Sequence, residues 1–130
     1  MKHILTILTF VSTTAFAQSD EMAVKQAVDK LFEGMKKSDT AMIRSAFSSS
    51  SLLQTIAKNK EGKIRVVTEA LDSFLVSIAS PHTEVYDERI KIDVVKIDGE
   101  LAIVWAPYKF YLGDQFSHCG VDSFQLIKID

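Results

Sequence analysis

The chain has 130 residues, of which 15 are basic and 17 acidic, and a formal net charge of −2 at pH 7. This length is typical of a single domain around one core. The weakly negative charge gives no basic footprint for nucleic acid or for an anionic membrane surface. A hydrophobic content of 47% is enough for a core that needs no metal or disulfide.

The start of the chain has the three parts of a secretory signal peptide. Lys2 and His3 form a short basic region, Ile4 to Val11 an apolar region, and Ala15-Phe16-Ala17 a cleavage site. The apolar stretch of about 8 residues is far shorter than the roughly 20 that a membrane-spanning helix needs. We therefore expect cleavage after Ala17, a periplasmic or secreted domain over residues 18–130, and no membrane attachment after cleavage.

Three helices are predicted in the first part of the domain. Apolar residues recur at helical spacing from Asp20 to Lys37. Ser38-Asp39 then offers an N-cap for a short second helix, which the serines from Ser48 to Ser51 close. A third helix is expected to begin with Thr68 as its cap and to end at Pro81. Its apolar residues stand at positions i, i+3, i+4 and i+7, namely Leu71, Phe74, Leu75 and Ile78.

Strands are predicted around and after the third helix. Leu52 to Ile56 and Ile64 to Val67 flank a polar turn and predict a hairpin. After Pro81, three long segments are rich in β-branched and aromatic residues and predict an antiparallel meander. These segments are Glu84 to Ile97, Leu101 to Leu112 and Phe116 to Ile129.

Turn residues and parity add detail to the meander. Asp98-Gly99 best fits a type I′ turn, and Gly113-Asp114 supplies the second turn. Ile90, Ile92 and Val94 share one parity while Val95 and Ile97 take the other, which predicts a bulge or a sheet buried on both faces. Pro107 has no N–H for a sheet ladder, so a bend or a neighbouring bulge is expected there.

The last four residues, Ile127 to Asp130, echo Val95 to Asp98, where the earlier strand enters a turn. A further strand would be expected after Asp130, because without it the last strand has an unpaired edge. The sequence therefore predicts either a truncated domain or an edge covered by a partner.

Three segments carry a resemblance to a known family: Phe32 to Asp39, Val104 to Tyr111, and Phe116 to Asp122. With the order of the elements, they resemble secreted bacterial members of the nuclear transport factor 2-like superfamily, labelled Putative lumazine-binding or SnoaL-like. The resemblance implies an α+β fold in which a cone-like curved antiparallel sheet packs against three N-terminal helices around an apolar pocket. The usual last strand is missing here. Members include isomerases, cyclases, dehydratases and noncatalytic binders, so the fold does not decide the function.

One face of the last predicted strand carries the sharpest functional signal. Side chains alternate along a strand, so His118, Gly120, Asp122 and Phe124 share a face. The glycine would leave room for a ligand between two titratable groups about 13 Å apart. Burial in an apolar pocket would raise the pKa of Asp122 and suit it to act as a general base. The alternative is that His118 and Asp122 each bond to a neighbouring strand or helix end.

The preceding strand offers aromatic side chains that could line a cleft: Trp105, Tyr108 and Tyr111. Core packing explains such aromatics equally well. Asp87, Glu88 and Arg89 are expected to form a solvated rim or a structural ion pair. Cys119 is the only cysteine, so no intrachain disulfide can form, and a buried inert thiol is expected rather than a paired or reactive one.

The leading hypothesis is an exported domain that binds a small apolar or aromatic molecule without converting it. The second is a cofactor-independent isomerase, cyclase or dehydratase with Asp122 as base and His118 or Tyr108 as hydrogen-bond donor. The third is an interaction module, with a homodimer through the sheet, as the resemblance implies. No phosphate loop or hydrolase motif is present, and no close spacing supports metal ligation by His82, His118 and Asp122. No cofactor, metal or nucleic acid is therefore expected.

Overall fold

The computed structural model describes the backbone of residues 13–129 and the side chains of residues 20–129. The basic and apolar regions of the predicted signal peptide, residues 2–11, lie outside the described residues. The first helix, α1 (Thr13–Lys37), begins earlier than the expected Asp20, and residues 13–19 contain neither glycine nor proline to break it.

The junction between the first two helices follows the sequence prediction closely. Ser38 takes a φ of 54°, which ends α1 and turns the chain back toward α2 (Thr40–Arg44). The side chain of Asp39 accepts a hydrogen bond of 2.9 Å from the backbone N–H of Met42 and so caps α2. Gly34 lets the two helices approach closely, since a Cβ there would lie 2.7 Å from a side-chain carbon of Ile43.

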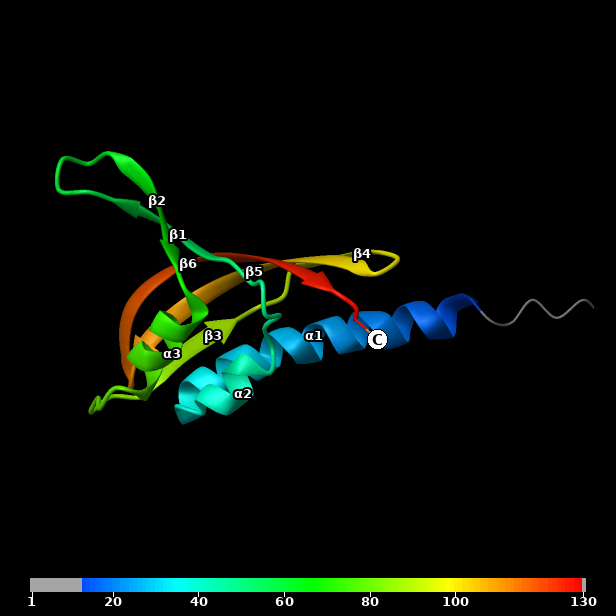
Figure 1. Ribbon diagram of the computed structural model, residues 1–130, viewed down its shortest axis with the longest axis horizontal. Coiled ribbons are helices and arrows are strands. Elements are labelled where there is room, and N and C mark those ends of the chain that lie inside the picture. Colours follow the sequence, from blue (N-terminus) through cyan, green and yellow to red (C-terminus); the bar gives the residue numbers. More distant parts are fainter. Residues whose placement is uncertain (1–12, 130) are drawn as a thin grey trace, which may run out of the picture.

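The hairpin that follows is confirmed and stands alone. β1 (Leu53–Lys58) pairs only with β2 (Ile64–Glu69), in an antiparallel register that sets Ile56 opposite Val66. Figure 1 shows this hairpin projecting away from the rest of the molecule. α3 (Leu71–Ala79) follows at once. The predicted cap at Thr68 is wrong, because that residue is still in β2 and α3 begins after Ala70, whose side chain makes no capping bond.

A four-stranded antiparallel sheet completes the fold, with β5 (Leu101–Leu112) at its centre. β6 (Gln115–Ile127) pairs with one side of β5 along nearly its whole length. On the other side, β3 (Tyr86–Ile90) and β4 (Val94–Asp98) follow one another. Both tight turns begin with a glycine at φ 58°, and Glu100 and Asp114 keep negative φ. This pattern belongs to type II′ turns, so the type I′ prediction at Asp98-Gly99 is wrong.

The single strand predicted over Glu84 to Ile97 is interrupted by the expected bulge. Ile90 pairs with Tyr108 and Val94 with Trp105, so three residues, 91–93, face only two of β5. The carbonyl of Pro107 accepts a 2.9 Å bond from Lys91, and in a strand the nitrogen of a residue faces the same side as its carbonyl. Because proline has no N–H to donate on this side, the ladder between β5 and the β3–β4 segment lacks a hydrogen bond at Pro107 and is interrupted there.

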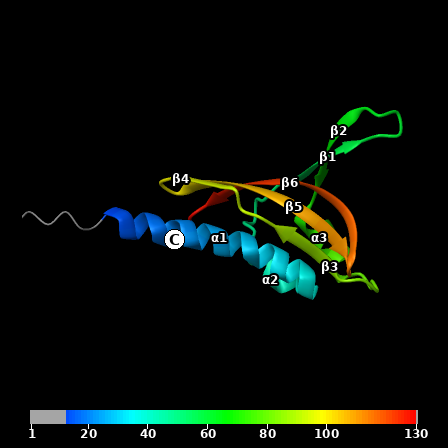
Figure 2. The same cartoon turned by 180° about the vertical axis from the view of Figure 1, so that it is seen from behind.

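The sheet curves around α1, which lies along its concave face (Figures 1 and 2). Even-numbered residues of β5, and of β6 from His118 onward, point to this face, and Val104 and Ala106 are almost fully buried. The ring of Phe32 on α1 meets Phe124 on β6 edge to face at 6.0 Å. The core extends from these side chains to Met35 of α1, Ile43 of α2, and Leu75 and Ile78 of α3. The fold is thus α+β, with a curved sheet that does not close into a barrel.

Candidate functional site

The candidate site lies on the concave face of the sheet, beyond the apolar core that α1 covers. β5 contributes Tyr108, which pairs across the ladders with Gly120 of β6 and with Ile90 of β3. Glu88 is two residues before Ile90 on β3, and Asp122 is two residues after Gly120 on β6. Strand alternation turns Glu88, Tyr108 and Asp122 to the same face.

The carboxyl groups of Glu88 and Asp122 meet across β5 and interact by hydrogen bond and charge. Burial, the negative charge of Asp122 and its hydrogen bond raise the pKa of Glu88 to about 8. Burial also raises the pKa of Asp122, and the hydrogen bond from Glu88 partly offsets that rise. Two such groups titrate as a unit, so at neutral pH the pair keeps one proton, held mainly by Glu88.

One atom of this pair lacks a partner. Oδ2 of Asp122 is shielded from solvent and accepts no hydrogen bond from any described residue. A buried carboxylate oxygen without a donor is unfavourable, because it has lost water without replacing it. Asp122 can therefore accept a hydrogen bond from a ligand, and that bond would free the proton of Glu88, which is donated to Asp122 in the free protein, to act as donor or acid.

Tyr108 lies beside the carboxyl pair. Burial raises the pKa of its phenol, and the negative charges of Glu88 and Asp122 raise it further. A Cβ on residue 120 would lie 2.7 Å from the phenol oxygen and 2.8 Å from a ring carbon, so the ring rests directly on Gly120. The prediction that this glycine leaves room for a ligand is therefore wrong, since the Tyr108 ring occupies that space.

The six side chains predicted as ligand-binding residues divide between the two faces of the sheet. Tyr108, His118, Asp122 and Phe124 lie on the concave face, whereas Trp105 and Tyr111 lie on the convex face. His118 is exposed and packs against Phe110 at 5.1 Å and Tyr108 at 5.8 Å. Phe124 belongs to the packing around the core. Of the other predicted residues, the structure thus places Tyr108 beside Asp122, whereas His118 contacts Tyr108 and lies four residues along β6 from Asp122.

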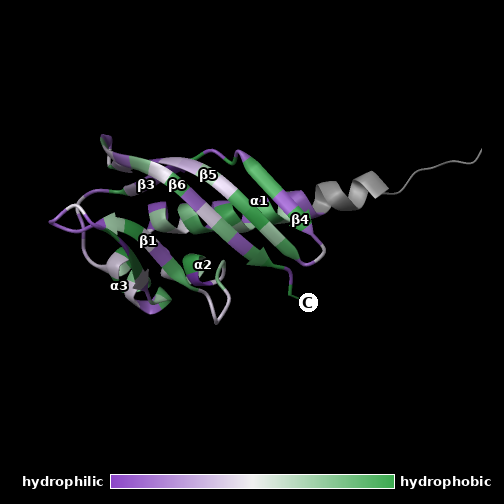
Figure 3. Cartoon of the chain, turned by 90° about the horizontal axis from the view of Figure 1, so that it is seen from above, coloured by the Kyte–Doolittle hydropathy of each residue, from purple (hydrophilic) through white to green (hydrophobic). Residues whose placement is uncertain are grey.

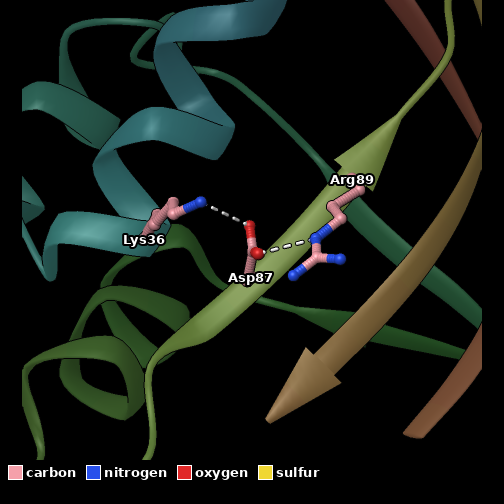
Figure 4. A network of polar contacts seen from close by, with 3 residues as sticks. All are labelled: Lys36, Asp87 and Arg89. Atoms are coloured by element: carbon pink, nitrogen blue, oxygen red, sulfur yellow. Dashed lines mark hydrogen bonds and ion pairs between the residues drawn. The ribbon is translucent and has the colours of Figure 1, made fainter. Parts of the chain in front are cut away.

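Glu88 is the site residue that the sequence analysis missed. It was grouped with Asp87 and Arg89 as a charged rim, although it shares the parity of Tyr86 and Ile90 and these flank the core. Its charged neighbours do form an ion pair. Asp87, 7% exposed, accepts bonds from Arg89 at 2.8 Å and from Lys36 of α1 at 3.1 Å (Figure 4). Burial raises the pKa of Asp87, but the two cations outweigh it and lower the pKa overall.

Three further expectations concern Cys119, metals and cavities. The expected buried thiol is wrong, because Cys119 has odd parity and is exposed on the convex face. No group of three metal-binding side chains occurs within residues 20–129. A cavity of about 160 Å³ lies between the middle of α1, the β4–β5 turn and the end of β6, and a hollow of about 500 Å³ lies beside α2 and α3. Neither is lined by Glu88, Tyr108 or Asp122.

A curved antiparallel sheet around a long helix, with polar groups on its concave face, is a nuclear transport factor 2-like fold. The family model described as Putative lumazine-binding matches residues 19–130, and the chain belongs to this family. The family predicted from the sequence is thereby confirmed. No curated protein matches the chain. Among its described residues no helix is long and apolar enough to cross a membrane.

Two solved structures share the fold. An NTF2-like protein of unknown function from Shewanella baltica OS155 has 21% sequence identity and a TM-score of 0.65, over 92% of this chain and 88% of that one. A second NTF2-like protein of unknown function, from Shewanella oneidensis MR-1, has 19% identity and a TM-score of 0.60, over 87% of this chain and 89% of that one. At such identities they establish the α+β fold and leave the ligand open.

Proposed function

We propose that the protein binds a small, largely aromatic molecule on the concave face, through a polar edge that meets Glu88, Tyr108 and Asp122. The observation that carries the proposal is the carboxyl pair, which keeps one proton and has an unpartnered oxygen. In the free protein the single O–H of protonated Glu88 donates to Asp122. A ligand N–H that donates to the ionised Asp122 takes the place of this bond and frees the O–H of Glu88 to donate to a ligand C=O. The pair therefore complements an N–H and C=O group side by side, as in a lactam or imide.

The name of the family suggests lumazine as the first probe, because its pyrimidine ring carries such an edge. Isothermal titration calorimetry at pH 7 should detect binding to the wild-type protein. Asp122→Asn removes the charged acceptor and should weaken binding roughly tenfold or more. Trp105→Phe, on the convex face, is the matched control and should bind as the wild type does.

Glu88→Gln gives a sharper test. A glutamine N–H₂ donates as the protonated acid does, so this variant should bind at pH 7 with little loss. Above pH 8 the wild-type Glu88 loses its proton and its donor, and wild-type binding should fall, while binding by the variant stays constant. Absence of lumazine binding, or a wild-type affinity that does not depend on pH across this range, would contradict the proposal.

A second candidate function is acid–base catalysis without a cofactor, as an isomerase, cyclase or dehydratase. The raised pKa values of Glu88 and Asp122 favour it, because a group that titrates near neutral pH can both take and return a proton. In this scheme Asp122 abstracts a proton next to a carbonyl, and His118 or Tyr108 donates to the enolate oxygen. Deuterium uptake from solvent into an enolisable cyclic ketone, abolished in Asp122→Asn and retained in Trp105→Phe, tests it. The binding role predicts no uptake.

A homodimer through the sheet is a third element of the proposal. The convex face exposes apolar side chains along β4, β5 and β6, among them Leu101, Ile103 and Trp105, each between 43 and 49% exposed. Figure 3 looks onto this face and shows apolar residues along β4 and β5. Contiguous apolar surface of this kind marks interaction sites. Light scattering should give a dimer for the wild-type protein and a monomer for Ile103→Lys, and a wild-type monomer would refute the idea.

Export completes the proposed function. The expected cleavage after Ala17 places the binding site in a periplasmic or secreted domain. N-terminal sequencing of the protein recovered from outside the cytoplasm should begin at Gln18. Recovery only from the cytoplasm, with Met1 or Lys2 at the start, would contradict export.

A further inference from the structure

The β1–β2 hairpin is the most exposed regular element of the described chain. Both strands project from the body and pair with no third strand (Figure 1). At its tip the side chain of Asn59 accepts hydrogen bonds from the backbone N–H groups of Glu61 and Lys63 at 3.1 and 2.8 Å. Gly62 closes the turn with a φ of 77°. An isolated two-stranded hairpin is at best marginally stable in water, so this one is expected to rest against something.

One face of the hairpin is aliphatic and uncovered. The register places Ile56 opposite Val66, with Ile64 two residues before Val66 on the same face. These three side chains are 77, 60 and 71% exposed respectively. Lys58 pairs with Ile64 at the outer end of the face, where its alkyl stem can extend the apolar surface and its ammonium group can reach beyond it.

Positive charge gathers at the tip beside this face. The eight residues from 58 to 65 hold four basic side chains, Lys58, Lys60, Lys63 and Arg65, against the single acidic Glu61. None of the four forms an ion pair with any residue that the structure describes. Elsewhere seven basic side chains do pair with carboxylates. Figure 3 shows the hydrophilic tip next to the hydrophobic strand segments.

The near-neutral total charge therefore conceals a local segregation of charge. The absence of a basic footprint, inferred from composition, holds for the whole chain but not for this hairpin. A partner for the surface of the hairpin must offer negative charges and an apolar layer next to them. A second copy of the hairpin would bring like charges together. Single-stranded nucleic acid would call for stacking aromatics, and residues 53–69 contain none.

We propose that the β1–β2 hairpin docks the protein onto an anionic lipid surface. Ile56, Ile64 and Val66 enter the boundary between headgroups and acyl chains, while Lys58, Lys60, Lys63 and Arg65 lie among anionic headgroups. The docking is peripheral and reversible. It is independent of the ligand site, because the hairpin contributes no residue to the concave face at Glu88, Tyr108 and Asp122.

Sedimentation of the full-length chain with vesicles tests the proposal. Vesicles of phosphatidylcholine that contain roughly 30 mol% phosphatidylglycerol should bind the wild-type protein. Added salt should weaken binding because it screens the charge of the headgroups. Lys60→Ala combined with Lys63→Ala should reduce the partition coefficient about 25-fold, roughly fivefold for each charge. Ile56→Ser combined with Val66→Ser should reduce it roughly tenfold or more.

The matched control removes two other basic residues that have no ion-pair partner among the described residues, Lys30→Ala with Lys109→Ala. It changes the net charge equally and should bind as the wild type does. The apolar segment before α1 is identical in all variants, so differences among them report on the hairpin alone. Circular dichroism and lumazine titration should be unchanged in every variant. Equal vesicle binding by all variants overturns the proposal, as does a change of oligomeric state on light scattering that is confined to the hairpin variants.

Discussion

The contact between Tyr108 and Gly120 allows a quantitative test of how the candidate site is built. In Gly120→Ala the new Cβ would lie 2.7, 2.8 and 2.9 Å from the phenol oxygen and two ring carbons of Tyr108. Real carbon atoms do not approach so closely, so either the ring or strand β6 must move. Overpacking of this kind costs about 1–3 kcal/mol of the free energy of unfolding. For a domain of this size it should lower Tm by roughly 5–15 °C.

The background determines the sign of the effect. In Tyr108→Leu the ring is gone, and the same Gly120→Ala change adds a methyl group to a strand position with ordinary backbone dihedrals. Alanine is there expected to stabilise the protein by about 0.5–1 kcal/mol, because glycine loses more conformational freedom on folding. The double-mutant cycle should therefore give a coupling energy of about 1.5–4 kcal/mol, well above the error for independent sites.

Urea unfolding of the four proteins measures the cycle, and lumazine titration at pH 7 adds a second readout. Displacement of the phenol should weaken ligand binding in Gly120→Ala while the α-helical circular dichroism signal is retained. If Gly120→Ala destabilised the protein equally in both backgrounds, the Tyr108 ring would not rest on residue 120, and the reasoning about the site would fail.

Three other perturbations have definite signs. Glu88 has a raised pKa in the folded protein, so its protonated form stabilises the fold. This contribution is fully present below pH 4.5 and is lost as the pH rises toward about 8, so Tm should fall over that range. Glu88→Gln should make this fall of Tm less steep. Asp87 has a lowered pKa, so its contribution is present at neutral pH and is lost in acid. Asp87→Asn should cost about 1 kcal/mol at pH 7, by urea unfolding, and progressively less below pH 4. Asp39→Ala should cost about 1 kcal/mol through loss of the α2 cap, with no change in ligand affinity by calorimetry.

Local patterns in the sequence predicted most of the fold. The cap at Asp39, the hairpin on either side of Gly62 and the bulge after Ile90 each depend on a few neighbouring residues, and all three are present. The turn at Gly99 was assigned to the wrong type because Asp-Gly favours type I′, whereas the register places Gly99 and Glu100 at the centre of the turn. One residue of register separates the two types, and no local pattern specifies it.

The candidate site was only partly predictable, because its residues come from three strands. Alternation on β6 correctly predicted that His118 and Asp122 share a face. It could not show that the next carboxyl group belongs to β3, 34 positions earlier at Glu88. Nor could alternation alone tell which face of β5 the core would cover, so Trp105 and Tyr111 were grouped with Tyr108 although they point the other way. The available signal for Glu88 was its position two residues before Ile90, which places it on the same strand face as a residue that packs against the core.

The bulge opposite Pro107 links the fold to the site. Val95 and Ile97 of β4 point to the concave face with odd parity, whereas Glu88 and Ile90 of β3 point to it with even parity. The extra residue among 91–93 accounts for the opposite parities of β3 and β4, because one inserted residue reverses the parity of the residues that follow it in the strand. Without the bulge, a strand that kept Val95 and Ile97 inward would turn Glu88 to the convex face and bring Asp87 toward Asp122. The bulge opposite Pro107 thus changes the parity of the strand so that Glu88 lies on the same face as Asp122 and can share a proton with it.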